Sequence, residues 1–466
     1  MGLGFSIFLL FISGQFAYEK PLIEKPVTSL VIVYSGVGFL FLLLLRLIPR
    51  TKYSKGLGLW VVGVGFLMRL IVIPSTAILE DDFYRYLWDG AVVAHGMNPY
   101  KYSPAGISHK PLPDSTDARQ LQKLADEAGP TFERINHPTI RTIYPPITQA
   151  IFALSYVIDP WNFTVWKLLL FLVDGLNLLL FIYLLKLLQK SILYLALYWW
   201  NPLVVKEIFN SGHMDVLILP FLLFALIMLV KRKMYFSHLS LAFATGVKFW
   251  PIILLPGFLK PFWGDAKKIF ISILLFVLVA GAMVFPLLTA GLDQDAALVN
   301  YSKRWEANTA LFQVWLWVAE GILNALKIHP GHAQFWVRVW VVCLMGVWIL
   351  AVLKFCNSSR PHDFTPMLYI VAALFLISPT QFPWYFIWVM PFLVFRPGFP
   401  LFLLVGLLPL YYLLYYFNTR GQPEIFHDAI VWIEYLPVWI LLVLAGIKGM
   451  VARKKSSIGP IEQDFS

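Results

Sequence analysis

The chain has 466 residues, of which 59% are hydrophobic and 14% charged, and its formal net charge is +11. Long apolar runs recur from one end to the other, which excludes a soluble globular protein and indicates a polytopic membrane protein with one membrane domain. Excess positive charge in such a protein belongs to cytoplasmic loops, so it does not argue for nucleic-acid binding. The two cysteines, Cys343 and Cys356, are too few for a disulfide framework.

Apolar segments predict the membrane-spanning helices. Because a span needs about 20 apolar residues, the candidates are 2–16, 28–48, 57–78, 162–186, 213–230, 270–288, 335–353, 365–378, 385–396, 399–416 and 429–447. Residues 2–16 lack the basic start and the cleavage site of a signal peptide, so we expect a retained first span. Shorter apolar pieces at 145–158, 192–209, 236–259 and 308–327 are further spans, re-entrant pairs or in-plane helices. We predict an all-α polytopic membrane protein with about 11 to 13 transmembrane helices.

Basic residues predict the orientation, because cytoplasmic loops are enriched in Lys and Arg. The cations that mark such loops are Arg46, Arg50, Lys52 and Lys55, then Lys231, Arg232 and Lys233, then Lys267 and Lys268, and finally Lys448, Arg453, Lys454 and Lys455. The chain then divides into N-terminal transmembrane helices (1–79), an extracytoplasmic loop (80–143), a transmembrane core (144–450) and a cytoplasmic tail (451–466).

The loop 80–143 is the longest polar segment of the chain. It is rich in charge, proline and turn residues, and its pattern predicts one helix near 114–128. Loops of this length in compact proteins are usually functional. We therefore expect the functional site to involve this loop.

The loop begins with a cluster of acids, "EDDFYRYLWDG" at 80–90. The pattern predicts a helix from Glu80 to Gly90 with its three acids in the first turn, where the helix dipole favours negative charge. Asp82, Arg85, Tyr86 and Asp89 then share one face. A charged helix start with local ion pairs explains part of this pattern. A carboxylate beside aromatic side chains also suits a sugar hydroxyl that must be held and deprotonated.

Several motifs together resemble a known family. The order Asp-Asp-x-Tyr-Arg-Tyr-x-Trp-Asp-Gly, then "GMNPY" (96–100), then "YPP" (144–146) is similar to the first outer loop of GT-C-type bacterial membrane glycosyltransferases. The nearest groups are the polyprenyl-phosphate-mannose-dependent mannosyltransferases, including glycosyltransferase family 87. Three later segments resemble the same group, namely "NPLVVKEIFNSGHMD" (201–215), "GVKFWPIILLP" (246–256) and "SPTQFPWYFIWVMPFL" (378–393).

The resemblance implies a GT-C-like helical bundle with an acidic first outer loop, a donor sugar on a polyprenyl phosphate carrier, and a catalytic Asp in that loop. Asp82 and Asp81 both match the position of this Asp. We prefer Asp82, which leads directly into Tyr-Arg-Tyr, and keep Asp81 in reserve. Mannose is favoured by resemblance alone, with glucose, arabinose and galactose open. The resemblance also favours a bacterial plasma membrane with the active site extracytoplasmic.

The expected substrate-binding residues come from the outer loop and from the three later segments. They are Arg85, Tyr86, Trp88, Asp89, Asn98, Tyr100, Tyr144, His213, Asp215, Lys248, Arg304, Gln381 and the aromatic positions 384–386, which are Trp384, Tyr385 and Phe386. For some of these residues a purely structural role is an alternative to substrate binding. His213 and Asp215 are also a helix-capping pattern, and Lys248 is also a candidate interfacial anchor.

Transfer from a lipid phosphate needs a general base for the acceptor hydroxyl and positive charge at the leaving phosphate. Cations expected near the outer side are Arg85, His137, Arg141, His213, Lys248, Lys303 and Arg304. One base acting in a direct displacement inverts the anomeric carbon without a covalent intermediate. No Gly-rich turn of a nucleotide-binding fold is evident. A monophosphate leaving group needs no obligatory metal, although the acids leave a divalent cation as an alternative.

Two other functions remain open at this point. A lipid or glycan transporter or flippase would carry paired repeats and interrupted helices near the bilayer midplane, and no repeat is visible in the sequence. A glycan polymerase or ligase with a lipid diphosphate donor would also carry a large outer loop and cations. The acceptor, whether a glycolipid or a glycan, the linkage and the oligomeric state are not readable from the sequence.

Overall fold

The computed structural model describes residues 1–109, 116–291, 296, 299–300, 305–327, 329, 331, 333–356 and 360–458. The structure is 77% helical. Within these ranges it has no strand, and its β structure is one isolated bridge between Ala307 and Thr380. The prediction of an all-α polytopic membrane protein is confirmed.

Seven helices in the described residues are long and apolar enough to cross a membrane. They are Val27–Arg50, Lys55–Val72, Phe163–Leu187, Ala266–Thr289, Ala333–Phe355, Phe399–Asn418 and Pro423–Gly449. An eighth candidate is a broken pair, Pro202–Asn210 and Met214–Val230, bent by 104°. Each of these falls on an apolar run that the sequence predicts as a span or as a shorter apolar piece.

The predicted 11 to 13 spans exceed this count because five apolar helices are short. These are Gly2–Phe16, Pro146–Ile158, Trp250–Phe262, Leu311–Ala325 and Thr365–Ile377, each 10–17 residues long. A helix rises about 1.5 Å per residue, so 17 residues reach about 25 Å, less than the hydrocarbon core of about 30 Å. Composition alone does not separate such helices from full spans.

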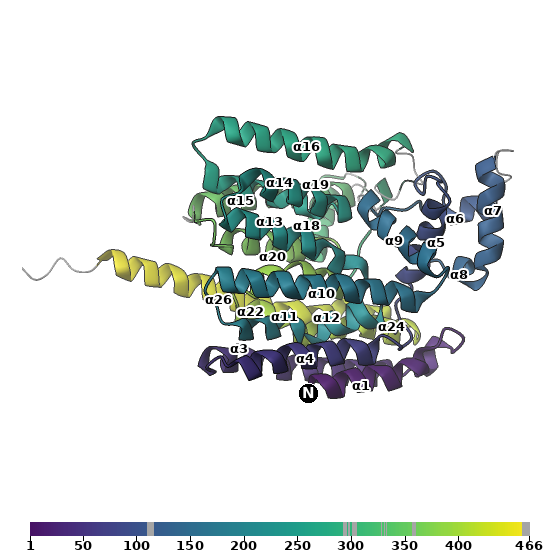
Figure 1. The fold of residues 1–466 in the computed structure, drawn as a ribbon, viewed down its shortest axis with the longest axis horizontal. Helices are drawn as coiled ribbons and strands as arrows, with labels where there is room; N and C mark the ends of the chain where they lie inside the picture. The colour runs from purple at the N-terminus through teal and green to yellow at the C-terminus, as the bar shows by residue number, and fades with distance from the viewer. Residues whose placement is uncertain are drawn as a thin grey trace, which may run out of the picture.

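The N-terminal helices lie along one side of the bundle (Figure 1). They are α1 (Gly2–Ser13), α2 (Val27–Phe41), α3 (Leu43–Leu47) and α4 (Lys55–Val72). Helix α1 packs on α4, and α2 packs on α23 (Leu404–Leu407). These contacts tie the start of the chain to its C-terminal part.

Five helices form a cap at one end of the bundle, which we define as residues 80–158 (Figure 1). They are α5 (Asp82–Ala94), α6 (Pro104–His109), α7 (Thr116–Ala128), α8 (Pro130–Glu133) and α9 (Pro146–Ile158). The predicted helix near 114–128 is α7. The predicted helix at 80–90 is α5, but it begins at Asp82, so Glu80 precedes it and Asp81 is its N-cap residue. Only Asp82 of the three acids lies in the first turn.

The remaining helices form the core and continue the chain from the cap. They are α10 (Phe163–Leu187), α11 (Ala196–Trp199), α12 (Pro202–Val204), α13 (Leu219–Val230), α14 (Met234–Val247), α15 (Leu255–Leu259), α16 (Ala266–Thr289), α18 (Leu311–Ala325), α19 (Ala333–Phe355), α20 (Thr365–Ile377), α21 (Met390–Leu393), α22 (Phe399–Phe402), α23, α24 (Leu413–Asn418), α25 (Pro423–Ile425) and α26 (Val431–Ile458). Short 3-10 and π turns join many of them. Of the predicted tail 451–466, residues 451–458 continue α26 and 459–466 lie outside the described residues.

Helices α5 and α9 pack closely because of Gly90. A Cβ atom at this position would lie 2.3 Å from the carbonyl oxygen of Phe152 on α9, so any larger residue would force the two helices apart. One face of α5 is therefore buried against the core, and it includes Tyr86, stacked on the Phe152 ring at 4.7 Å. This packing fixes the direction in which the first turn of α5 presents Asp82.

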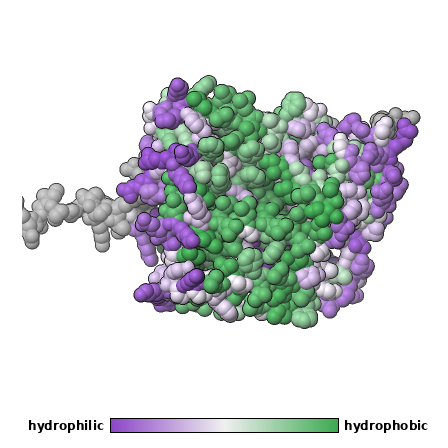
Figure 2. Space-filling view, in the orientation of Figure 1, coloured by the Kyte–Doolittle hydropathy of each residue, from purple (hydrophilic) through white to green (hydrophobic). Residues whose placement is uncertain are grey.

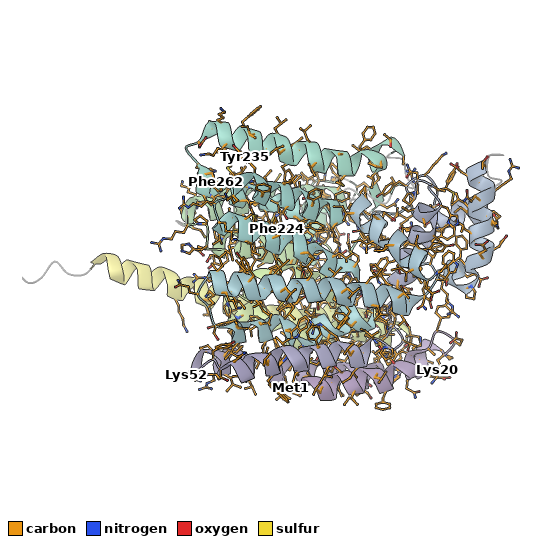
Figure 3. All side chains as sticks on the ribbon, viewed as in Figure 1. Met1, Lys20, Lys52, Phe224, Tyr235 and Phe262 are labelled. Atoms are coloured by element: carbon orange, nitrogen blue, oxygen red, sulfur yellow. The ribbon has the colours of Figure 1, made fainter. Side chains whose placement is uncertain are left out.

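The surface is divided into a hydrophobic band between two polar ends. Figure 2 shows a broad hydrophobic zone with hydrophilic residues gathered at both ends of the view. Lys20 lies toward the end that carries the cap, and Lys52 lies at the opposite end (Figure 3). Such a band is what a bilayer-spanning bundle requires.

One buried ion pair joins the N-terminal helices to the core. Arg69 on α4 donates from Nε to Asp174 on α10 at 2.7 Å, and both side chains are fully buried. The guanidinium also donates to the carbonyl oxygen of Trp199 at 2.7 Å and lies over its ring. The Asp174 carboxylate accepts a further bond from the hydroxyl of Tyr198. Three separate segments are thus joined at one point.

We predict that Arg69→Met lowers the midpoint of thermal unfolding of the purified protein strongly. The substitution leaves the Asp174 charge buried without its cation, which costs about 3 to 5 kcal/mol. The double variant Arg69→Met/Asp174→Leu removes both charges and should be less destabilised than Arg69→Met alone. Purely additive losses in a double-mutant cycle would show that the pair is not coupled.

Candidate active site

A cavity of about 590 Å³ lies where the cap meets the core. One side consists of cap residues from 80–86 and 136–145. The other consists of core residues from four separated segments, at 215, 248–250, 382–388 and 411–415, with Trp305 in addition. The volume is in the range of small-molecule sites. Residues that are far apart in the sequence therefore meet around one space.

The segment that leads into α5 is held in place by two buried side chains. Asn210 donates to the hydroxyl of Ser75 and the carbonyl of Thr76, and its own amide oxygen accepts from the backbone of Ile78. Lys167 donates to the carbonyl of Ser75 at 2.6 Å. These side chains bond to backbone groups of residues 75–78 that have no helical partners. The chain can therefore turn sharply before the acids at 80–82.

Leu79 marks that turn, because its φ is 66°, in the left-handed region. A non-glycine residue is strained there by about 1 to 3 kcal/mol and stays only where its surroundings hold it. Such strain clusters at functional sites. The next residue is Glu80, so the turn directs the acids toward the cavity rather than into a continuous helix.

Asp82 lines the cavity and is contacted by residues from both the cap and the core. Asn136 donates to its Oδ1 at 2.6 Å, and the Tyr86 hydroxyl lies 3.5 Å from its Oδ2. Nδ1 of His213 lies 3.6 Å from the same Oδ2. The Asp82 side chain is 26% exposed, so it is accessible from the cavity yet largely out of bulk water.

The pKa values of the two adjacent acids are both raised. Burial is the main cause of the rise in the pKa of Asp82, and Asn136, Lys248 and His137 oppose it. Burial and the Asp82 charge raise the pKa of Asp81 to about 6, against the Asn136 hydrogen bond. Asp81 also lines the cavity and accepts from Asn136 at 2.8 Å. A carboxylate with a raised pKa is a better proton acceptor near neutral pH.

Arg85 is fixed in the cavity wall by two bonds. Its Nε donates to Asp89 at 3.1 Å, and its Nη2 donates to the carbonyl of Ile140 at 2.6 Å. Asp89 in turn accepts from Gln149 at 3.1 Å. Of the residues predicted to share one face of α5, Asp82, Arg85 and Tyr86 line the cavity. Asp89 does not line it but holds the Arg85 side chain in position.

Lys248 supplies positive charge on the core side. Its Nζ forms an ion pair with Asp215 at 2.7 Å and lies 4.2 Å from the ring of Tyr385. Trp388 donates from its indole to Asp215 at 2.6 Å. The Lys248 side chain is 19% exposed and lines the cavity. Its charge is thus available to an anionic group in the cavity while Asp215 holds it in place.

Besides Trp305, eight aromatic side chains line the core side, and we call these eight the aromatic wall. They are Phe249, Trp250, Phe382, Trp384, Tyr385, Trp388, Tyr411 and Tyr415. Trp250 and Tyr385 both stack on Trp388, at 5.3 and 4.2 Å between ring centroids. Flat rings of this kind offer surfaces for apolar chains and for sugar faces.

The structure brings most predicted site residues to the cavity. Those that line it are Asp81, Asp82, Arg85, Tyr86, Tyr144, Asp215, Lys248, Trp384 and Tyr385. His213 lies directly behind Asp82. The roles assigned to all of them remain predictions.

Five predicted polar or aromatic residues support the walls of the cavity without lining it. Trp88 packs on Phe132 within the cap. Asp89, Asn98, Tyr100 and Gln381 bond to protein groups instead: Asn98 accepts from the backbone of Tyr100, Tyr100 donates to the carbonyl of Tyr144, and Gln381 donates to the carbonyl of Leu376. Arg304, like Lys303, lies outside the described residues.

Phe386 is a sixth predicted residue that does not line the cavity. Residue 386 is a phenylalanine, which has no hydroxyl group to donate to a substrate. The Phe386 side chain is fully buried and packs on Phe375 of α20, with ring centroids 5.5 Å apart. Trp384, Tyr385 and Trp388 of the short 3-10 helix Pro383–Trp388 line the cavity, while Phe386 packs in the core.

Sequence reasoning missed several side chains that the structure places at the cavity. They include Asn136, Thr142, Trp250, Trp305, Trp388, Tyr411 and Tyr415. The run "PLYYLLYY" at 409–416 is typical of an interfacial aromatic belt, so its spacing did not single it out. Asn136 had no signal except its place in the outer loop.

The described residues contain no group of three His, Cys, Asp or Glu side chains arranged to hold a metal ion. The expectation that no metal is obligatory remains a prediction.

Comparison with known proteins places the chain in a family. A family model described as alpha-(1->6)-mannopyranosyltransferase, N-terminal domain, matches residues 18–263, more than half of the chain. Comparisons with curated proteins and with solved structures gave no match. The matched range includes the cap, His213, Asp215 and Lys248, so the cavity is built largely from the family region. The chain belongs to the alpha-(1->6)-mannopyranosyltransferase family and is a glycosyltransferase of the mannosyltransferase class.

Proposed function

We propose that the protein transfers mannose from a polyprenyl phosphate carrier to a hydroxyl of a glycolipid or glycan acceptor, with inversion at the anomeric carbon. The observation that carries this proposal is one carboxylate, Asp82, facing a cavity whose walls also present Arg85, Arg141 and Lys248. A base and cations at one cavity are what this transfer needs.

In the proposed step, the acceptor oxygen attacks the anomeric carbon while its proton passes to Asp82. The bond between that carbon and the phosphate oxygen breaks, and its electron pair stays on the phosphate. Lys248 is the cation whose ammonium is accessible on the core side, so it is the residue proposed to stabilise the leaving phosphate. No covalent sugar–enzyme bond is required, because one displacement completes the reaction.

The family supports a further detail of the substrates. An alpha-(1->6) product requires a primary 6-hydroxyl as the acceptor, and inversion then requires a donor with the β configuration. The aromatic wall suits the polyprenyl end of the donor, since the rings Trp250, Tyr385 and Trp388 stack beside Lys248. The polar cap side, with Asp82 and Asn136, then faces the acceptor.

The distribution of charge supports an extracytoplasmic active site. The cap lies at one end of the bundle, and Lys52 of the predicted cytoplasmic loop 46–55 lies at the other (Figure 1 and Figure 3). Cytoplasmic loops carry the excess of Lys and Arg. A carrier lipid in the outer leaflet would meet the cavity directly, at the plasma membrane of a bacterium.

Asp82→Asn should lower the turnover of the purified protein by about 10²-fold to 10⁴-fold, the usual contribution of a general base. The amide keeps the shape but cannot accept the proton. The measurement is release of polyprenyl phosphate from a polyprenyl-phosphate-mannose donor. Asp81→Asn is the matched variant and should retain more activity. Near wild-type turnover by Asp82→Asn with an inactive Asp81→Asn would assign the base to Asp81.

Activity should fall on the acid side at a pH above the ordinary aspartate pKa of 3.8, because burial raises the pKa of Asp82. The carboxylate is the active form, so turnover is lost as pH falls through that raised pKa. Asn136→Leu removes a donor that favours the charged form and should move the acid limb of kcat/KM to higher pH. An acid limb that stays in place in Asn136→Leu would contradict this assignment.

Lys248→Met should raise KM for the donor and lower kcat, because the phosphate loses its cation. Lys248→Arg should recover part of the loss, and Lys260→Met is the control. Lys260 is also buried, but it caps the end of α19 by donating to the carbonyl of Leu353, away from the cavity. A donor with a diphosphate leaving group, tested in parallel, should be a poor substrate. Preference for the diphosphate would favour a polymerase or ligase instead.

A further inference from the structure

His213 occupies a break in a membrane-depth helix. The segments Pro202–Asn210 and Met214–Val230 meet at a bend of 104°, and Gly212 between them has a φ of 77°. A Cβ at Gly212 would lie 2.5 Å from the ring of Phe163, so the bend requires glycine. Trp166 donates to the Gly212 carbonyl at 2.7 Å. The bend is thus anchored to α10, and it directs His213 toward the acids of residues 80–82.

The imidazole of His213 lies flat on Trp384, with ring centroids 3.9 Å apart and planes inclined by 13°. The residue is fully buried, and neither ring nitrogen has a hydrogen-bond partner. Buried polar groups are nearly always paired, so an unpaired imidazole needs a reason. The stacked indole of Trp384 restricts tilting of the imidazole out of this plane.

Each nitrogen faces a carboxyl group. Nδ1 lies 3.6 Å from Oδ2 of Asp82, and Nε2 lies 3.8 Å from Oε2 of Glu80. Both distances exceed a hydrogen bond by about half an ångström. Catalytic hydrogen bonds are often long before substrate binds and tighten in the complex. A small movement would therefore let the His213 imidazole form one hydrogen bond to Asp82 and another to Glu80.

Glu80 is suited to donate rather than accept. It is buried, and burial together with the neighbouring acids Glu207 and Asp82 raises its pKa well above the ordinary value, against the charge of Lys206. A neutral carboxyl group carries a proton that it can donate to Nε2. That bond would fix the tautomer with the proton on Nδ1, the nitrogen that faces Asp82.

Glu207 lies on the same side as Glu80 but has donors of its own. It accepts from the hydroxyl of Tyr412 at 2.9 Å, from Tyr34 at 3.2 Å and from Lys206 at 3.4 Å. Its Oε2 is 3.8 Å from Nε2 of His213. Because Lys206 pairs with its charge and both tyrosine hydroxyls donate to it, Glu207 does not need the imidazole proton.

We propose, resting on the proposed function, that His213 is a positioning residue for the base: its Nδ1–H donates to Oδ2 of Asp82, and its Nε2 accepts from the carboxyl group of Glu80. Asn136 donates to the other oxygen of Asp82 from the cap. The two donors hold the carboxylate from opposite sides.

The other charged or titratable groups that act on Asp82 come from four elements. Asp81 precedes it, His137 comes from the cap loop, Asp215 follows His213, and Lys248 follows α14. Tyr86 and Tyr144 complete the surroundings. The Tyr86 hydroxyl also donates to Oδ2, at 3.5 Å, so a His213 donor would be the second donor to this oxygen.

Three substitutions of His213 separate this role from a packing role. The amide nitrogen of His213→Asn takes the place of Nδ1 and can still donate to Asp82. The amide of His213→Gln takes the place of Nε2, and His213→Leu keeps bulk without any donor. A hydrogen bond to a charged group is worth about 10-fold to 100-fold. We expect kcat to fall by that factor in His213→Leu and His213→Gln, and by less in His213→Asn.

The acid limb of the pH profile is the readout that packing would not change. Loss of a donor to the charged form should move the limb up by about one pH unit in His213→Leu, while His213→Asn keeps it in place. Glu80→Leu, which removes the donor to Nε2, should move the limb in the same direction as His213→Leu, and Glu80→Gln, which keeps a donor, should move it less. His238→Asn is the control, because His238 is also buried but bonds to the carbonyl of Met234 away from the cavity.

Equal losses in all three His213 variants with an unmoved acid limb would overturn the positioning role and leave the proposed function standing. The same limb shift in His238→Asn would overturn it as well. Failure of the proposed function would look different, since Asp82→Asn would then retain turnover whatever His213 does.

Discussion

A carboxylate that must stay charged away from bulk water is the constraint on which this cavity depends. Removing a charge from water costs several kcal/mol unless other groups donate to it. Asp82 meets this requirement through Asn136 from the cap and through its position near His213 and Lys248 from the core. The donors come from separate segments, so the site exists only when cap and core are packed together.

The same constraint explains features that look irregular when taken alone. Leu79 has a strained backbone, the helix at 202–230 is broken, and Gly90 brings α5 against α9 without a side chain between them. Each feature directs a polar group into the cavity or toward the carboxylate. Asn210 connects two of them, because it lies at the end of the first half of the broken helix and binds the segment before Leu79. Strain in these places is offset by the surrounding packing.

Much of the fold could be predicted because hydrophobic length is a strong signal. Runs such as 162–186 and 270–288 are helices close to their predicted bounds, Phe163–Leu187 and Ala266–Thr289. The division near Gly212 agrees with the predicted segments 192–209 and 213–230, but the sequence gives no sign that the two halves meet at a bend of 104°. The start of α5 was wrong by two residues, because the contacts of Asn210 with residues 75–78, which end the preceding turn, come from a distant part of the chain.

Part of the candidate site could also be predicted from the sequence. Motifs with unusual polar residues in apolar surroundings, such as Asp82, Asp215 and Lys248, do meet at the cavity. Aromatic site residues were harder to predict, because the sequence around Trp88 and Trp388 does not tell a packing role from a site role. Packing places Trp88 inside the cap and Trp388 at the cavity. Asn136 depends on the path of the cap loop, which no local pattern encodes.

If Asp82 is the proton acceptor, its environment sets the pH at which the enzyme works. Difference infrared spectroscopy of the carboxyl C=O band, wild type minus Asp82→Asn, measures the titration of this one group. We expect a carboxyl signal that titrates above the ordinary value of 3.8 and at the same pH as the acid limb of kcat/KM. A signal that titrates at or below the ordinary value, away from that limb, would contradict this expectation.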